Sequence, residues 1–407
     1  MEEGKKINKK ILIFVPTFPV VSETFIQRDI SKLVEFGNLD ITIVRLASGD
    51  GEIEDNLKSL LRNARITIPS MFLGFLYFFT KATNVKKVFA IIMQDNTKIV
   101  IGRLYLFLKS LAYTSYFKKF SPNEIHVHFL NDSSTIAMVA SIILDIPFSI
   151  NAHARDITQY PTLPVQKAKY AKFITVCNKY AYEKCIEIAQ SDNQKIHLIY
   201  HGHDKEKLFK YPVTIQKDNT KTNIFAGGTR LTEKKGLGYL IEASKILKEQ
   251  NIKHKINLIG PGPLYDALIE KIKFYDLSDT FIIHGKGQGL PFGYVSQYYQ
   301  TADIFALPII NTDENDVDGI PNTIIEAALA KLPIITTNAG SVGELIEDNV
   351  TGLVVEQKNS VMLANAIKKL IDDKDLRVNL GNAAYDKAIK MFDSNTNVGE
   401  LEKLLVM

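Results

Sequence analysis

Short runs of β-branched and other apolar residues alternate along the chain with stretches in which apolar positions recur at helical spacing. This alternation is typical of α/β proteins, in which helices connect the strands of a parallel sheet. The first half predicts strands at 11–15, 40–46, 65–68, 125–129, 147–150, 172–176 and 196–200. The second half predicts strands at 223–226, 255–259, 280–283, 304–307, 333–336 and 352–355, and only helical patterns follow Asp375.

The polar segment 210–222 separates the two series of strands, since it contains a proline and has no periodicity. We therefore expect one Rossmann-like domain over 1–209, a linker, and a second Rossmann-like domain over 223–385. Residues 386–407 should form C-terminal helices that can pack back on the first domain. A length of 407 residues fits two such domains.

Composition places the chain among folded proteins, because 46% of its residues are hydrophobic and 23% are charged. Two cysteines, Cys177 and Cys185, match no zinc or redox spacing and provide no disulfide framework. The apolar run at 11–15 is too short for the core of a signal peptide. These features predict a cytoplasmic protein.

Charge is distributed unevenly, although the net charge of +4 is too small to indicate nucleic acid binding. Residues 57–120 hold eleven lysines and arginines but only one acidic residue, Asp95. Aromatic residues are interleaved with these cations, and the longest apolar stretch, 68–80, is too short to cross a bilayer. This composition predicts peripheral contact with anionic lipid. The alternative is that the aromatic side chains are core and the lysines are simply solvated.

In the first half, the loop 16–23 follows the first predicted strand, and Thr24 with Gln27 forms a capping box for the next helix. The start of that helix should lie at the carboxyl edge of the sheet, where open α/β sheets bind ligands. Ser22, Glu23 and Thr24 are therefore candidate ligand-binding residues. An ordinary turn explains the same residues equally well.

In the second half, the stretch 225–236, with three glycines and the cations Arg230 and Lys235, follows a strand and precedes a helix. A guanidinium and an ammonium group that converge on a helix start can bind a diphosphate, and the glycines would let the backbone approach it. The alternative is a solvated basic turn.

A second candidate anion site is the segment from Asp318 to Glu326. Pro321 is expected as the first residue of a helix, so the amides of its first turn would be free to bind an anion. Glu326 has no cation nearby in sequence and could accept hydrogen bonds from a ribose diol. Alternatively, Asp318 caps the helix and Glu326 is exposed.

Histidines form two His-x-His pairs, His126 with His128 and His201 with His203. A metal site requires a third ligand at a diagnostic spacing, and neither pair has one. His153 differs from these, because it directly follows a predicted strand at the ligand-binding edge. The glycine turn at 260–263 lacks the third glycine of a dinucleotide fingerprint, which disfavours a dehydrogenase.

Together these motifs resemble the retaining, nucleotide-sugar-dependent glycosyltransferases of glycosyl transferases group 1, which have the GT-B fold. The resemblance is strongest to enzymes that extend bacterial capsule and exopolysaccharide repeat units. It implies an α/β fold of two Rossmann-like domains that face each other across a cleft, followed by a C-terminal helical tail. The residues that carry it lie at 16–25, 126–129, 152–157, 230–236, 258–263, 302–308 and 318–326.

The resemblance also implies roles for individual residues. His153, Asp318, Arg230 and Lys235 would be catalytic, with the two cations on the donor diphosphate and His153 beside the donor sugar. The donor nucleotide sugar would be bound by Arg230, Lys235, Gly260, Gly285, Lys286, Asp318, Gly319, Ile320, Pro321, Asn322, Thr323 and Glu326. The acceptor, expected to be a lipid-linked sugar, would meet Ser22, Glu23 and Thr24. No metal or other cofactor is expected.

Three positions depart from the usual pattern of this family. Asp318 stands where a glutamate is usual, Thr229 replaces a glycine, and Pro261 replaces an aspartate. Two other functions stay open: a nucleotide-sugar epimerase or hydrolase on the same fold, and, because of Asp318 alone, a non-catalytic membrane-associated homologue. The expected location is the inner face of the cell membrane, reached through residues 57–120.

Overall fold

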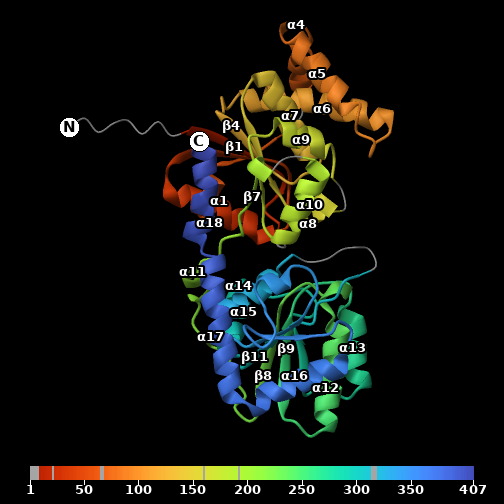
Figure 1. Ribbon diagram of the computed structural model, residues 1–407, viewed down its shortest axis with the longest axis vertical. Helices are drawn as coiled ribbons and strands as arrows, with labels where there is room; N and C mark the ends of the chain where they lie inside the picture. The colour runs from red at the N-terminus through yellow and green to blue at the C-terminus, as the bar shows by residue number, and fades with distance from the viewer. Residues whose placement is uncertain (1–8, 21–22, 65–67, 159–160, 191–192, 313–318) are drawn as a thin grey trace, which may run out of the picture. The chain divides into compact units, whose positions relative to one another are not determined.

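The computed structural model describes residues 9–20, 23–64, 68–158, 161–190, 193–312 and 319–407. Contacts between Cα atoms divide the chain into two compact units. Unit 1 contains the described residues up to Gly202 together with Ser394–Met407, and unit 2 is His203–Asp393. The chain therefore enters unit 1 twice, at its start and at its end (Figure 1).

Unit 1 contains a parallel sheet with the strand order β3-β2-β1-β4-β5-β6-β7. Its strands are β1 (Lys9–Phe18), β2 (Leu39–Ser48), β3 (Leu61–Asn63), β4 (Glu124–His128), β5 (Phe148–Ala152), β6 (Ile174–Val176) and β7 (Ile196–Leu198). Its helices are α1 (Thr24–Phe36), α2 (Asp55–Lys58), α3 (Ile68–Phe75), α4 (Tyr77–Thr80), α5 (Ala82–Ile92), α6 (Val100–Lys118), α7 (Asp132–Leu144), α8 (Ala154–Thr158), α9 (Pro164–Tyr170), α10 (Lys179–Ala189) and α18 (Ser394–Val406).

Alternation along β1 divides the apolar core of unit 1 between the two faces of the sheet. Leu12 and Phe14 belong to the core cluster that includes α7 and α10, whereas Ile11, Ile13 and Val15 belong to the cluster that includes α1 and α18. Helix α18 contributes Val398, Leu401 and Leu405, which recur at helical spacing and pack with α1.

Helices α4–α6 lie at the outer end of unit 1 (Figure 1), but Ile91 of α5 and Leu106, Tyr113 and Phe117 of α6 belong to the core cluster that includes α7 and α10. A separate apolar cluster, formed by residues of α4, α5, α6 and α7, joins these helices to the outer side of α7. The part of this region that packs on α7 is therefore core. This agrees, for these residues, with the alternative that the aromatic side chains belong to the core. The helices nevertheless leave many large apolar side chains exposed, and these are described below.

Unit 2 contains a second parallel sheet, with the order β10-β9-β8-β11-β12-β13. Its strands are β8 (Thr222–Gly228), β9 (His254–Ile259), β10 (Phe281–His284), β11 (Ile304–Ala306), β12 (Ile334–Thr337) and β13 (Leu353–Val355). Its helices are α11 (Lys205–Phe209), α12 (Leu237–Glu249), α13 (Tyr265–Phe274), α14 (Phe292–Thr301), α15 (Asn322–Leu329), α16 (Ser360–Asp372) and α17 (Lys374–Met391).

The predicted α/β class, with two parallel sheets and a helical tail, is confirmed. The strand expected at 65–68 is the exception. Residues 65–67 lie outside the described part of the chain, Ile68 begins α3, and the edge strand β3 is at Leu61–Asn63. Strand β3 has exposed polar residues and therefore lacks the apolar signal of a buried strand.

Candidate functional site

In unit 2, the loops after β8, β9, β10 and β11 meet at the carboxyl edge of the sheet. Arg230 lies in the loop after β8 and is exposed, whereas Lys235 ends a short 3₁₀ turn and is buried. Backbone hydrogen bonds join this loop to the next one, from Thr229 N to Ile259 O (2.9 Å) and from Leu231 N to Pro261 O (2.8 Å). The two cations are thus carried on a braced loop.

Two glycines at this edge are required by contacts inside the protein. A Cβ atom on Gly260 would lie 1.7 Å from the carbonyl oxygen of Thr229, and one on Gly236 would lie 1.9 Å from that of Pro308. Gly236 also has a φ of 63°, in the left-handed region. Gly236 therefore lets two loops touch, a reason for this glycine that is independent of the expected approach of a ligand.

The turn after β10 contains Gly285 and Lys286, the expected support for the base. Both residues have positive φ values, 78° and 48°, and Gln288 N donates to Gly285 O (2.9 Å). A Cβ atom on Gly285 would lie 2.3 Å from Gly289 O, so this glycine is needed to close the turn. The tight turn exposes backbone at the same sheet edge as Lys235.

Helix α15 begins at the same edge, and no side chain caps it. The helix starts at Asn322, one residue later than predicted, so Pro321 is the N-cap residue and not the first residue of the helix. Thr323 is 8% exposed, and its hydroxyl oxygen has no hydrogen-bond partner among the described residues. Gly319 and Ile320 directly precede this helix start, whereas Asp318 lies outside the described residues.

Glu326 is 7% exposed, so the alternative of a solvent-exposed carboxylate is wrong. The hydroxyl of buried Tyr299 donates to Glu326 Oε2 at 2.8 Å and lies 3.2 Å from Thr323 O. Burial, followed by the neighbouring Glu326 carboxylate, raises the pKa of Tyr299 well above its usual value. Tyr299 stays protonated and fixes the orientation of the carboxylate.

At the carboxyl edge of unit 1, helix α1 begins at Thr24, with Glu23 as the cap residue. The predicted capping box is wrong, because no side chain caps the helix and Gln27 is bound elsewhere. Its amide group donates to Glu52 O and accepts from Glu54 N, both at 3.2 Å. Gln27 therefore ties α1 to the chain before α2. Ser22 lies outside the described residues.

His153 directly follows β5 and belongs to a column of stacked rings. The centroid of His153 lies 5.2 Å from that of His201 and 6.0 Å from that of His128, and the ring planes differ by 16° and 17°. Phe25 of α1 stacks on His201 at 4.2 Å. Four segments, the start of α1 and the ends of β4, β5 and β7, thus supply one continuous ring column that we call the histidine column.

Burial keeps most of this column uncharged. It lowers the pKa of His128 and His153 well below the usual histidine value, and neighbouring histidines lower both further. Burial would also lower the pKa of His201, but Cys177 and Asp29 outweigh it and raise that pKa to about 9. His201 Nδ1 lies 3.0 Å from Asp29 Oδ2, so the residue is an imidazolium at neutral pH.

His126 and His128 share the buried face of β4, as their spacing predicted. His126 Nδ1 contacts the Ser149 hydroxyl at 2.9 Å, and burial lowers its pKa to about 4. The described residues hold no group of three or more His, Cys, Asp or Glu side chains arranged to bind a metal ion. His201 and His203 belong to different units.

Polar contacts made by Asp156 of α8 and Lys167 of α9 lie next to the column. Asp156 accepts hydrogen bonds from the backbone N–H groups of Leu130 and His153, and burial raises its pKa to about 7. Fully buried Lys167 donates to Asn131 O (2.7 Å) and to the Thr162 hydroxyl (2.6 Å). Burial lowers the pKa of Lys167 to about 7.

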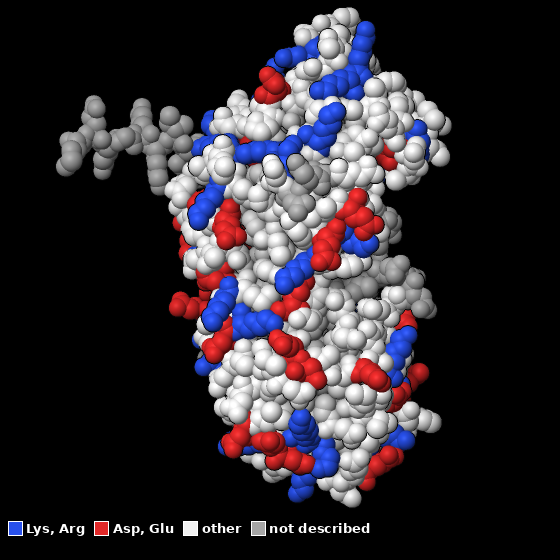
Figure 2. Space-filling model, in the orientation of Figure 1, with Lys and Arg blue, Asp and Glu red and all other residues white. Residues whose placement is uncertain are grey.

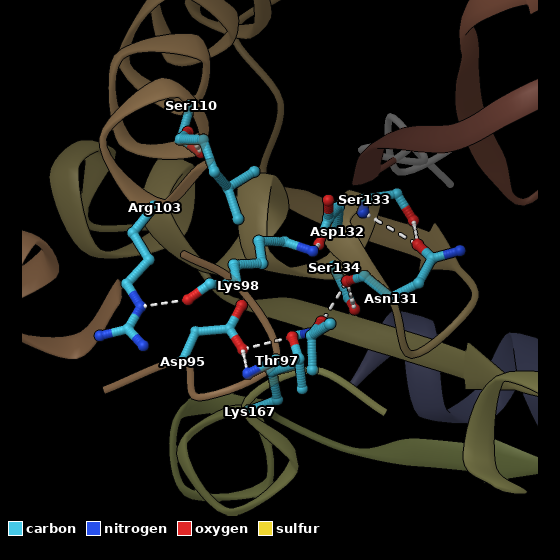
Figure 3. A network of polar contacts seen from close by, with 12 residues as sticks. Asp95, Thr97, Lys98, Arg103, Ser110, Asn131, Asp132, Ser133, Ser134 and Lys167 are labelled. Atoms are coloured by element: carbon cyan, nitrogen blue, oxygen red, sulfur yellow. Dashed lines mark hydrogen bonds and ion pairs between the residues drawn. The ribbon is translucent and has the colours of Figure 1, made fainter. Parts of the chain in front are cut away.

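The same network reaches the turn between α5 and α6 (Figure 3). Lys98 Nζ lies 3.0 Å from Asp132 Oδ1, and Asp95 accepts from the backbone N–H and the hydroxyl of Thr97. Arg103 donates to the carbonyl oxygens of Lys98 and Met93. Helices α5 and α6 are therefore fixed to the start of α7 by polar contacts as well as by their apolar cluster.

Sequence reasoning did not single out Asp29, Phe25 or Lys167. Phe25 and Asp29 are four residues apart on α1, so they lie on the same face of that helix. The signal available in the sequence for Asp29 was an acidic residue among the apolar positions of one helix face. Lys167 offered none, because nothing in a Pro-Val-Gln-Lys segment distinguishes a buried lysine from a solvated one.

Known proteins resemble this chain in sequence. The family model described as Glycosyl transferases group 1 matches residues 213–387. The amylovoran biosynthesis glycosyltransferase AmsK of Erwinia amylovora is 25% identical over 97% of this chain and 99% of its own length. The putative colanic acid biosynthesis glycosyltransferase WcaL of Escherichia coli is 31% identical over 43% of each chain.

Solved structures resemble it over nearly the whole chain. A glycosyltransferase from Rickettsia africae is 17% identical and superposes with a TM-score of 0.71, covering 98% of both chains. Anabaena Alr3699/HepE, crystallised with UDP and glucose, is 18% identical with a TM-score of 0.68, covering 98% of this chain and all of the other. At these identities the likeness establishes the fold.

Proposed function

We propose that this chain, a glycosyltransferase with the GT-B fold whose residues 213–387 belong to glycosyl transferases group 1, transfers a sugar from a nucleotide-diphosphate-sugar to a lipid-linked oligosaccharide. The reaction would serve the synthesis of a bacterial capsule or exopolysaccharide. Relatives named for amylovoran, colanic acid and capsular polysaccharide biosynthesis support this assignment.

The observation that carries the proposal is the uncapped start of α15 beside a braced basic loop at one sheet edge. The first-turn amides of α15 and the hydroxyl of Thr323 are suited to phosphate oxygens. Arg230 and Lys235 would neutralise the remaining charge of the diphosphate. Glu326, oriented by Tyr299, would accept hydrogen bonds from the ribose hydroxyls.

In the proposed reaction the anomeric configuration is retained. The bond between the anomeric carbon and the diphosphate oxygen breaks while the acceptor oxygen bonds to the same face of that carbon. The leaving diphosphate takes the proton of the acceptor hydroxyl, and the cations and helix amides stabilise its charge without a metal ion. His153, with Asp318, would contact the donor sugar, and the acceptor would meet Glu23 and Thr24.

The acceptor proposal is supported by the surface of α3–α6, which we call the helical insert. None of the helices in the described residues is both long and apolar enough to span a bilayer. Where α4–α6 lie in Figure 1, Figure 2 shows lysine and arginine side chains among uncharged residues. Among the most exposed apolar side chains of the helical insert are Phe72, Phe79, Ile99, Val100, Ile101 and Tyr105, each at least 59% exposed.

Such a surface suits an anionic membrane, because apolar side chains enter the interface while cations meet lipid phosphates. Its acidic residue, Asp95, is only 2% exposed, so the carboxylate would not meet lipid phosphates directly. We propose that the helical insert binds the inner face of the cell membrane, where a lipid-linked acceptor would be found. The polar network around Lys98 and Asp132 would hold the insert to unit 1 during this contact.

The enzymatic proposal is tested with the full chain and a panel of nucleotide sugars. A true donor present at about 100 times its dissociation constant should stabilise the protein by about 2.7 kcal/mol, which a thermal-shift assay detects. Transfer should then require an acceptor extract, persist in excess EDTA, and give a product whose anomeric proton shows the donor's configuration by NMR. An inverted product or loss of transfer in EDTA would contradict the mechanism.

Donor-alone incubation separates the open alternatives. Consumption of a nucleotide sugar without an acceptor would favour an epimerase or hydrolase. Donor binding without turnover on any acceptor extract would favour a non-catalytic homologue.

Vesicle sedimentation tests the membrane proposal. The protein should bind vesicles that contain phosphatidylglycerol and not those of phosphatidylcholine alone, and replacement of Phe79 and Ile101 by serine should weaken binding at least tenfold. As a matched control, serine at exposed Phe274 of unit 2 should leave binding unchanged. Equal binding by the insert variant and the wild type would overturn the proposal.

A further inference from the structure

The ring of His153 lies against the rings of Phe25, His128, Phe129 and His201. Neither of its nitrogen atoms has a hydrogen-bond partner within the described part of the chain, and the ring is 8% exposed. The nearest carboxylate, Asp156, lies 3.9 Å from Nδ1 and already accepts from two backbone N–H groups. The usual device that fixes a functional histidine, a hydrogen-bonded carboxylate, is therefore not used at His153.

His201 supplies what His153 lacks, a ring fixed in place by a carboxylate. Asp29 Oδ2 binds His201 Nδ1 at 3.0 Å, and both residues are largely buried. Helix α1 contributes a second contact, because Phe25 stacks on His201 with a plane angle of 26°. One helix thus clamps His201 with a carboxylate and an aromatic ring, four residues apart.

The clamped ring lies almost parallel to His153, at 5.2 Å between centroids. A cation at this distance in a buried site opposes a second positive charge. Since His201 carries its charge at neutral pH, it disfavours protonation of His153 and restricts the tilt of that ring. His153 is left with one N–H donor and one free acceptor nitrogen, the form required to contact a sugar hydroxyl.

His126 also opposes a charge on His153, but only when His126 is itself protonated. His126 and His128 of β4 are neutral at pH 7, and Asp156 of α8 has a pKa of about 7 with Lys167 of α9 beside it. Cys177, after β6, acts on His201. His201 with Asp29 is therefore the fixed charge next to His153 at neutral pH.

We infer that His201, anchored by Asp29, is a positioning residue that keeps His153 neutral and fixes its ring plane for contact with the sugar substrate. This inference rests on the proposed function for the role of His153 in transfer. The part that concerns the protonation of His153 can be measured without any activity.

The test uses the full chain labelled with ¹⁵N-histidine, whose imidazole signals are followed by NMR from pH 5 to 9. In the wild type, His153 should remain neutral across this range. In His201→Phe, which keeps a stacked ring without a charge, and in Asp29→Asn, which keeps the shape of the clamp, the pKa of His153 should rise by about one unit or more. His197→Gln, at a half-buried histidine of β7 outside the column, is the control and should leave it unchanged.

Transfer assays then separate this inference from the proposed function. In the two variants, the acid limb of the kcat profile should move to higher pH while thermal stability stays close to that of the wild type. An unchanged His153 titration in both folded variants would overturn the inference, whatever the activity. Full transfer activity in His153→Ala would instead overturn the role proposed for His153 and leave the NMR result standing.

If His201→Phe does not fold, His201→Gln, which also lacks the charge, decides. An upward shift in the titration of His153 supports the inference, and an unchanged titration overturns it.

Discussion

The two units have parallel sheets of similar topology, but the groups at the carboxyl edge of the two sheets differ. In unit 1 the edge is made of side chains, the rings of the histidine column, which strand ends and α1 bring together. In unit 2 the edge is made largely of backbone, with tight glycine turns, loops joined by hydrogen bonds and an uncapped helix start.

The difference concerns what each edge tolerates. Backbone amides do not titrate, so the edge of unit 2 should be insensitive to pH but intolerant of added atoms where its loops touch. Histidines buried in the neutral form destabilise the fold once the pH falls below the pKa of the unfolded imidazole, so the edge of unit 1 should respond to acid. Four predictions test this contrast, in order of decreasing effect.

Gly260→Ala should lower the free energy of unfolding of unit 2 by about 4 kcal/mol, because the new Cβ would lie 1.7 Å from the Thr229 carbonyl oxygen and the backbone must shift. Gly343→Ala is the matched control, since nothing lies within 4 Å of a Cβ atom there. Urea unfolding followed by circular dichroism measures both. Equal midpoints for the two variants would show that the loops are not held as described.

Lys235→Ala should reduce turnover by about 10²-fold or more, because a preorganised charge at a leaving diphosphate is removed. Lys245→Ala removes a half-exposed lysine of α12 paired with Glu249, and should leave turnover unchanged. Initial rates at saturating donor, with melting temperatures as a check on folding, provide the comparison. A wild-type rate for folded Lys235→Ala would remove the lysine from the site.

Acid should destabilise unit 1. The pKa of His126 is about 4 in the folded protein and 6.5 in the unfolded chain. Its contribution to the free energy of unfolding is therefore complete above pH 6.5 and is lost as the pH falls toward 4. At pH 5 the loss is about 2 kcal/mol. His128 and His153 act in the same direction. Asp156 and His201, whose pKa values are raised to about 7 and to about 9, act in the opposite direction and together offset about one and a half histidines.

We therefore expect the urea concentration at which unit 1 unfolds to fall between pH 7 and pH 5, by the equivalent of about 2 kcal/mol. The shift should be smaller in His126→Gln, which cannot be protonated. A pH-independent transition would mean that these histidines are solvated.

Thr323→Val should have the smallest effect on folding. It replaces a buried hydroxyl that has no partner among the described residues by a methyl group of similar shape, and should raise stability by about 1 kcal/mol. If the Thr323 hydroxyl binds the donor nucleotide sugar, the KM for the donor should rise several-fold while kcat changes little. A loss of stability with unchanged KM would assign Thr323 to the fold alone.

Much of the fold could be predicted from sequence, because strands buried on both faces are nearly continuous apolar runs. The position of His153 at a strand end followed from that pattern in the same way. Strand β3 could not be found, since an exposed edge strand has no apolar signal.

The candidate site was predicted less completely, because its side chains depend on contacts between distant segments. Asp29 meets His201 across 172 positions, and no local pattern records such a pair. The reason for Gly236 was also hidden, since the oxygen that requires it belongs to Pro308. Local spacing identified residue types suited to a ligand but could not separate them from residues that hold loops together.

The division of unit 1 between both ends of the chain has a consequence for synthesis on the ribosome. Lys9 donates to the carbonyl oxygen of Leu405 and Lys172 to that of Leu404, and both lysines pair with buried Glu124. Unit 2 is continuous and has all its residues once Asp393 has left the exit tunnel. Unit 1 begins first but finishes last, because α1 alone covers the second face of its sheet only in part until α18 emerges.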